Sequence, residues 1–136
     1  MTKNVEHDFL LRNGGGFLIS IPDLSSDLED GDRVLDERSS VPVIFDYPLS
    51  RPVTFVLEAD GPFTVRKFAE AVARKYAEIY AEEDATSDNA PELVPGTLNR
   101  DLTSGHYGIW GHGIGDLVLE FASRQPDGNW RLFIGS

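Results

Sequence analysis

The chain has 136 residues, of which 40% are hydrophobic and 26% are charged, a composition typical of one globular domain with its own core. Its 23 acidic and 12 basic residues give a formal net charge of −11, which argues against a broad basic surface for nucleic acid or an anionic membrane. The absence of cysteine excludes disulfides and thiolate chemistry, and no apolar run reaches the roughly 18–20 residues of a transmembrane helix.

With no secretory signal at the start, we expect a soluble, cytoplasmic protein that is a monomer or a weak homodimer. We expect no cofactor, no direct contact with nucleic acid or membrane, and a protein as the partner, if there is one. The acidic balance itself is explained by solubility.

The first half of the chain predicts strands. Residues 8–24 contain two apolar runs joined by Asn13-Gly14-Gly15-Gly16, which is typical of a β-hairpin. Residues 23–40 are acidic, lack apolar periodicity and predict a surface loop. Two further strands are predicted at "VPVIFDY" and "VTFVLEA", which are rich in β-branched and aromatic residues. Pro42, inside the first of these, indicates an edge strand or a bulge.

Residues 65–82 predict an amphipathic helix. Thr64 is a good N-cap, and Phe63 before it can pack on Phe68 in the first turns. Spacings of three and four residues place one apolar stripe along the helix, made of Val65, Phe68, Ala69, Val72, Tyr76, Ile79 and Tyr80. Such a helix needs an apolar sheet face to cover.

The second half predicts a long connection and a final hairpin. Residues 84–105 contain few apolar residues, and connections of this length are usually functional or disordered. Leu117–Ala122 and Trp130–Ile134 predict two strands around a Pro126–Asn129 turn. The sequence therefore predicts a single α+β domain over residues 1–136. Its sheet would have about six largely antiparallel strands, with one main helix packed on one face.

The segment Ser104–Glu120, "SGHYGIWGHGIGDLVLE", contains most of the candidate site residues. A loop could bring His106 and His112 together with Asp116 or Glu120, a mixture of nitrogen and oxygen ligands that Zn²⁺ accepts. The histidine spacing matches no specific zinc motif, so we assign no metal site. Acid–base catalysis by Asp116 beside His112 is the other enzymatic interpretation.

A serine nucleophile and a phosphate cradle are both poorly supported in this segment. Ser104 lies two residues before His106 but has no G-x-S-x-G elbow around it. Glycine-rich phosphate loops open a helix, whereas this segment opens a strand.

The aromatic residues of the segment have a structural and a binding interpretation. Tyr107 and Trp110 could line a pocket, anchor a protein interface or cover one end of the sheet. Because Trp110 directly precedes a core strand, we expect it to be largely buried. We expect His112 to lie close to Asp116 or to the end of the helix, and one of the two glycines that flank His112 to need a positive φ.

Residues 76–120, "YAEIYAEEDA…LNRDLTSGHYGIWGHGIGDLVLE", resemble a pattern of short uncharacterised proteins, including some from large DNA viruses and microbial eukaryotes. The pattern joins a helix ending "Y..IY.EE" to a loop with "NR" and then "YGIWGH.I.DL.LE". The resemblance implies that the helix end, Asn99-Arg100 and the Trp-Gly-His loop form one unit. The group has no known activity, so no catalytic role is carried over. The pattern has an acid after the histidine where this chain has Gly113, which weakens an enzymatic interpretation.

These observations leave three hypotheses. The leading one is a non-enzymatic protein-binding or regulatory module, with candidate binding residues Asn99, Arg100, Tyr107, Trp110 and His112. The second is a metal-dependent or acid–base enzyme, with candidate catalytic residues His106, His112 and Asp116. The third is an acidic inhibitor of a nucleic-acid-binding protein.

Overall fold

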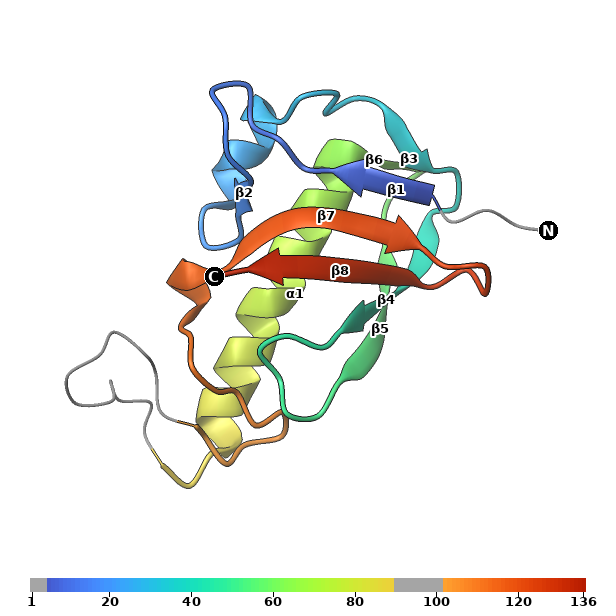
Figure 1. Ribbon diagram of the computed structural model, residues 1–136. Coiled ribbons are helices and arrows are strands. Elements are labelled where there is room, and N and C mark those ends of the chain that lie inside the picture. The colour runs from blue at the N-terminus through green and yellow to red at the C-terminus, as the bar shows by residue number, and fades with distance from the viewer. Residues whose placement is uncertain (1–4, 90–101) are drawn as a thin grey trace.

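The computed structural model describes residues 5–89 and 102–136, which form an α+β domain (Figure 1). Six strands make a mixed, mostly antiparallel sheet in the order β1-β7-β8-β4-β5, with β2 also paired to β7. These strands are β1 (Val5–Asp8), β2 (Phe17–Leu18), β4 (Ser40–Phe45), β5 (Val53–Glu58), β7 (Val118–Arg124) and β8 (Trp130–Gly135). Figure 1 shows α1 (Val65–Thr86) lying across one face of this sheet, which confirms the predicted fold class.

Three short elements complete the fold. A separate two-stranded ladder joins β3 (Val34–Asp36) to β6 (Phe63–Thr64), directly before α1. Two 3-10 helices, η1 (Pro22–Asp27) and η2 (Ile114–Asp116), precede β3 and β7. Within residues 5–89 and 102–136, no helix is long and apolar enough to cross a membrane.

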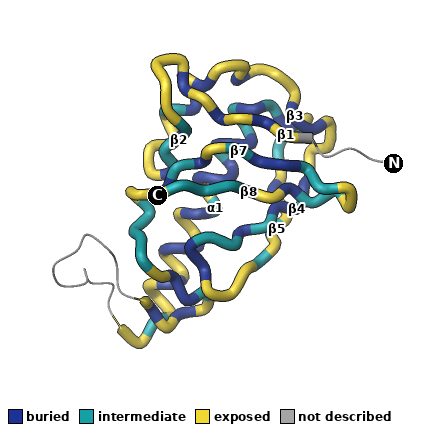
Figure 2. Tube along the Cα trace, in the orientation of Figure 1, coloured by how far each residue is buried: buried dark blue, intermediate teal, exposed yellow. Residues whose placement is uncertain are grey.

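The main helix begins and packs as its sequence predicts. The Thr64 hydroxyl accepts a hydrogen bond from the Lys67 backbone N–H at 3.1 Å, and the rings of Phe63 and Phe68 meet edge to face. The apolar stripe is buried against the sheet, where Figure 2 shows one side of the helix in dark blue. The helix continues past the predicted end at residue 82 and stops at Thr86.

The N-terminal turn forms as predicted, but its two arms pair mainly with another strand. Leu11 N–H donates to the Gly15 carbonyl at 3.0 Å, and Gly14 and Gly15 both have positive φ. Beyond this turn, β1 and β2 both run antiparallel to β7. The chain therefore pairs with β7 as β1, departs from it at the glycine turn, and then pairs with β7 again as β2.

The acidic segment 23–40 is not merely a surface loop, as its sequence had predicted. It contains β3, most of η1, and the buried side chains of Leu28, Leu35 and Asp36. Asp36 is 3% exposed and accepts hydrogen bonds from the Arg38 guanidinium and from the Trp130 indole N–H at 2.9 Å. Burial alone would raise the pKa of Asp36, but the hydrogen bonds from Arg38 and Trp130 outweigh it and lower this pKa to about 2. The polar sequence of this segment gives no indication that Asp36 is buried and hydrogen-bonded.

Pro42 does not mark an edge strand or a bulge, because β4 is internal and its register with β5 is continuous. The Ala59 N–H donates to the Ser39 carbonyl, which makes Ser39 and Ala59 a hydrogen-bonded pair. Hydrogen-bonded and non-hydrogen-bonded pairs alternate along an antiparallel ladder, so the Pro42 nitrogen points away from β5. It points toward β8, whose pairing with β4 covers only Val43 and Ile44. Proline therefore removes no ladder hydrogen bond at this position.

Candidate functional site

The organising residue of the candidate site is Glu83, in the last turn of α1. Its carboxylate is fully buried, a position that charged side chains occupy only when they are satisfied by partners. One oxygen, Oε1, accepts from the backbone N–H groups of Tyr107 at 2.8 Å and Gly108 at 3.1 Å. The other, Oε2, accepts from the Thr103 hydroxyl at 2.5 Å and from the backbone N–H groups of Gly105 and Ile109.

These hydrogen bonds decide the ionisation of Glu83. Burial by itself would raise its pKa, because the charged form loses hydration. The Thr103 hydroxyl and the backbone donors of the loop outweigh that effect and hold the pKa of Glu83 below its usual value. The carboxylate is therefore an anion at neutral pH, and its charge fixes the loop.

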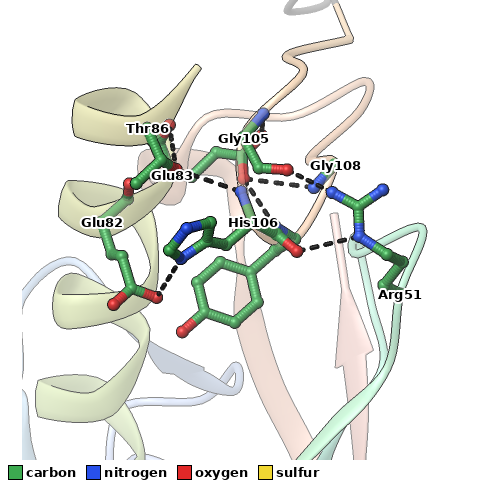
Figure 3. A network of polar contacts seen from close by, with 8 residues as sticks. Arg51, Glu82, Glu83, Thr86, Gly105, His106 and Gly108 are labelled. Carbon is green, nitrogen blue, oxygen red and sulfur yellow. Dashed lines mark hydrogen bonds and ion pairs between the residues drawn. The ribbon is translucent and has the colours of Figure 1, made fainter.

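The remaining N–H groups of the loop are also bonded, and Figure 3 shows the surroundings of the one at His106. The Thr86 hydroxyl accepts from the His106 N–H at 3.0 Å, and the Pro48 carbonyl accepts from the Trp110 N–H at 3.1 Å. Together with the four N–H groups held by Glu83, this accounts for every backbone N–H from Gly105 to Trp110. A glycine-containing loop is thereby held in one conformation.

The segment before β5 holds the loop from its other side. The Arg51 guanidinium donates to the carbonyls of Gly105 and His106 (Figure 3), and the Ser50 N–H donates to the Gly108 carbonyl at 2.9 Å. Gly105 has no room for a side chain, because a Cβ there would lie 2.5 Å from Glu83 atoms. Only glycine allows the loop backbone to come this close to the helix.

Trp110 is 42% exposed, which contradicts our expectation that it would be largely buried. Ile109 takes the buried position instead, through an isolated antiparallel bridge to Leu49. Successive side chains of an extended segment point to opposite sides, so the burial of Ile109 turns Trp110 outward. Ile109 and Trp110 are both large and apolar, and the core contains the smaller of the two, Ile109.

Trp110 forms an aromatic cluster with Tyr47 and His112. The rings of Tyr47 and Trp110 meet edge to face with centroids 5.5 Å apart, and the His112 ring lies 6.0 Å from Tyr47 and 6.4 Å from Trp110. The Ser136 hydroxyl lies within hydrogen-bond distance of both the Tyr47 hydroxyl, at 2.8 Å, and the His112 Nε2, at 3.2 Å. The aromatic cluster is therefore an ordered surface.

His112 lies near both of the groups expected for it. Its Nδ1 is 3.6 Å from a carboxylate oxygen of Asp116, and its carbonyl accepts from the Tyr80 hydroxyl on α1 at 2.9 Å. Of the glycines beside it, Gly111 has a positive φ of 77°, whereas Gly113 has a φ of −78°. The positive φ that we expected next to His112 is thus at Gly111.

His106 faces a different carboxylate. Its Nδ1 is 3.4 Å from a carboxylate oxygen of Glu82 (Figure 3). Burial, followed by the neighbouring Glu82 carboxylate, raises the pKa of Tyr107 to about 12. The two histidines thus contact separate acids, and the described part of the chain contains no group of three or more acids and histidines arranged to bind a metal.

The other candidate residues divide into those described and those not. Ser104 accepts a hydrogen bond from the Asp88 N–H and lies beside Ser87 at the end of α1. Asn99 and Arg100, like most of the predicted connection, lie outside the described residues.

Sequence reasoning missed Glu83, Tyr47 and Arg51. A signal for Glu83 existed, because it falls three residues after Tyr80 and four after Ile79, and so continues the apolar stripe. An acid in that position indicates a buried carboxylate with partners. Tyr47 and Arg51 carried no comparable signal, because they reach the loop only through tertiary structure.

Comparisons of the chain with protein-family models, with curated proteins and with solved structures found no match. The resemblance of residues 76–120 to the short proteins described above therefore stays a prediction.

Proposed function

We propose that this protein is a non-enzymatic binding module that holds a partner protein on the aromatic cluster of Tyr47, Trp110 and His112. The observation that carries this proposal is an exposed tryptophan on a loop whose consecutive backbone N–H groups are all bonded. Tryptophan is enriched among the residues that dominate binding energy at protein interfaces. A loop already held in place loses little conformational entropy on binding, which favours affinity.

The hydrogen-bonding of the cluster supports binding over catalysis. Both ring nitrogens of His112 face protein groups, Asp116 and Ser136, and the Tyr47 hydroxyl also faces Ser136. These groups orient the rings and leave their apolar surface for a partner. The enzymatic alternative has less support, because His106 and His112 contact different carboxylates and do not belong to one catalytic site.

The third hypothesis, an acidic inhibitor of a nucleic-acid-binding protein, rests on the net charge of −11 and requires no particular role for Trp110. It predicts binding that weakens steeply with salt, because the attraction would be between exposed charges. Binding centred on the aromatic cluster should depend more weakly on salt. The two hypotheses are therefore separable in one assay.

The test is affinity capture from an extract of the source cells with three forms of the protein: wild type, Trp110→Ala and Ile21→Ala. Ile21 is 46% exposed and supplies a matched control for loss of an exposed apolar side chain. We expect a protein that is retained by wild type and Ile21→Ala and lost with Trp110→Ala, at low and at moderate salt. Capture of the same proteins by all three forms would refute a role for the aromatic cluster. Capture that survives Trp110→Ala but not added salt would favour the inhibitor.

A further inference from the structure

The outer edge of β5 is a free sheet edge that carries, apart from Glu58 at its end, none of the features that usually protect one. Strand β5 ends the sheet next to β4 and has no further strand partner among the described residues (Figure 1). Natural edge strands are typically protected by lysine, proline, a bulge or short length. "VTFVLE" contains no lysine or proline, and its six residues pair in continuous register with β4. At the opposite edge, β1 is shorter and contains Glu6, His7 and Asp8.

The ladder between β4 and β5 fixes which backbone groups face outward. Since Ala59 and Ser39 form a hydrogen-bonded pair, every second residue of β5 counted back from Ala59 directs its N–H and C=O toward β4. Thr54, Val56 and Glu58 therefore direct theirs to the free edge. These are the groups that an added strand would use.

The side chains of these same residues are exposed on the sheet face opposite α1. Val56 is 61% exposed, more than any other large hydrophobic residue within residues 5–89 and 102–136. A β-branched apolar side chain at the middle of an unprotected edge favours pairing with another strand, which would cover it.

The surface beside this edge is suited to a second copy of the chain. A protein of net charge −11 repels itself, and the repulsion is weakest where its surface charge is balanced. The groove between β5 and α1 is such a place. If Glu58, which borders the groove at the strand edge, is counted, its charged lining residues are two acids and two bases; the others are Glu78, Arg74 and Lys75 of α1.

We propose that two copies of this protein associate through antiparallel pairing of β5 with β5 about a two-fold axis at Val56. A two-fold axis through the sheet keeps both α1 helices on one face, which requires each residue to pair with one from the same face. With the axis at Val56, this residue meets Val56 of the second copy, and Thr54 lies opposite Glu58. All three outward-facing residues then form hydrogen-bonded pairs, each exchanging two backbone hydrogen bonds. The result is one continuous sheet across the dimer, with the exposed valines in contact.

Because the chain has no cysteine, a single introduced cysteine tests this register directly. Hydrogen-bonded antiparallel partners have Cα atoms about 5.5 Å apart, within the range of roughly 4.4–6.8 Å that a disulfide spans. We expect Val56→Cys to form a covalent dimer under mild oxidation, many-fold faster than Thr54→Cys or Ile21→Cys. Thr54→Cys combined with Glu58→Cys should also cross-link. Equal rates for Val56→Cys and Ile21→Cys would reflect random collision and overturn the proposal.

Sedimentation equilibrium of the unmodified chain supplies the second measurement. We expect a concentration-dependent dimer that Val56→Lys converts to monomer, because the two lysines would repel each other. Its Tm should match that of wild type diluted until it is monomeric, since Val56 is exposed in the monomer. A wild type that stays monomeric at every concentration, or a dimer unaffected by Val56→Lys, overturns the proposal. Cross-linking of Val56→Cys to a different protein, in place of a second copy of this chain, also overturns the proposal.

Discussion

Glu83 Oε2 accepts a hydrogen bond at 3.3 Å from the N–H of Ile109, the residue directly before Trp110. The buried carboxylate thus reaches along the loop to the base of its exposed tryptophan. Because the same carboxylate also bonds Thr103 and Gly105, one side chain of α1 determines the backbone path on both sides of His106. The position of the aromatic cluster depends on this single acid.

Glu83→Gln should destabilise the protein by about 3 kcal/mol, because the amide replaces one acceptor by a donor that faces backbone N–H groups. Urea denaturation measures this change in the free energy of unfolding. Glu82→Gln is the matched control, since Glu82 lies next in sequence but is half exposed, and its change should stay within about 0.5 kcal/mol. Equal effects of the two substitutions would contradict the role given to Glu83.

Ile109→Ala should cost on the order of 2–5 kcal/mol, because Ile109 is fully buried and its removal leaves a cavity. Trp110→Ala should cost less than Ile109→Ala, because the indole is 42% exposed and its loss leaves no enclosed cavity. Thermal or chemical unfolding of both variants checks the order. A larger loss for Trp110→Ala would place the tryptophan in the core and remove the basis of the proposed binding surface.

Gly105→Ala should be strongly destabilising, because the new Cβ would collide with the backbone and carboxylate of Glu83. Gly113→Ala should be close to neutral or slightly stabilising, since a Cβ there meets nothing within 4 Å and its φ is negative. Comparing the Tm of the two variants tests whether the glycines of the loop are interchangeable. Similar losses for both would mean that the glycines act through loop flexibility.

His7 should make the protein less stable as the pH falls below about 6.5. It is buried with its Nε2 unbonded, and burial, followed by the charge of Arg33, lowers its pKa from 6.5 despite Asp30 and Asp8 nearby. A group with a lowered folded pKa binds protons preferentially in the unfolded state, so its stabilising contribution, complete above 6.5, is lost as the pH falls through the folded pKa. Asp36 and Glu83 follow the same sign at lower pH, and for Asp36 the loss falls between 3.8 and about 2.

The measurement is the free energy of unfolding between pH 7 and pH 5, for wild type and His7→Gln. The slope in that window should be smaller in His7→Gln, which cannot titrate there. An unchanged slope would assign the pH dependence to another group.

His106→Ala should leave stability within about 0.5 kcal/mol of wild type, because the His106 ring is largely exposed and its contact with Glu82 lies at the surface. Addition of a chelator should leave Tm unchanged, since the two histidines contact separate acids. A Tm lowered by chelation, and restored by Zn²⁺, would revive the metal-site interpretation.

The elements with a regular period could be predicted from the sequence, and the positions fixed by tertiary contacts could not. The helix is determined by a stripe of apolar residues with a clear cap, and the final hairpin by two apolar strands around a turn. Asp36 was hidden because Trp130, which donates to it in the buried site, is 94 residues away in the sequence. Ile109 and Trp110 are comparably apolar, so their sequence does not say which side chain enters the core.

The Glu83 network fixes the geometry of the aromatic cluster. This geometry therefore does not depend on the number of residues between Asn89 and the loop. Asn89 donates to the Leu102 carbonyl at 3.0 Å and accepts from the Ser104 N–H at 3.2 Å, so the chain is tied together on both sides of residues 90–101. Loop-closure entropy grows only slowly with the number of residues in a loop. Insertion of a short peptide tag between residues 89 and 102 should therefore leave the Trp110 environment unchanged, which makes this the natural position for a label or an epitope.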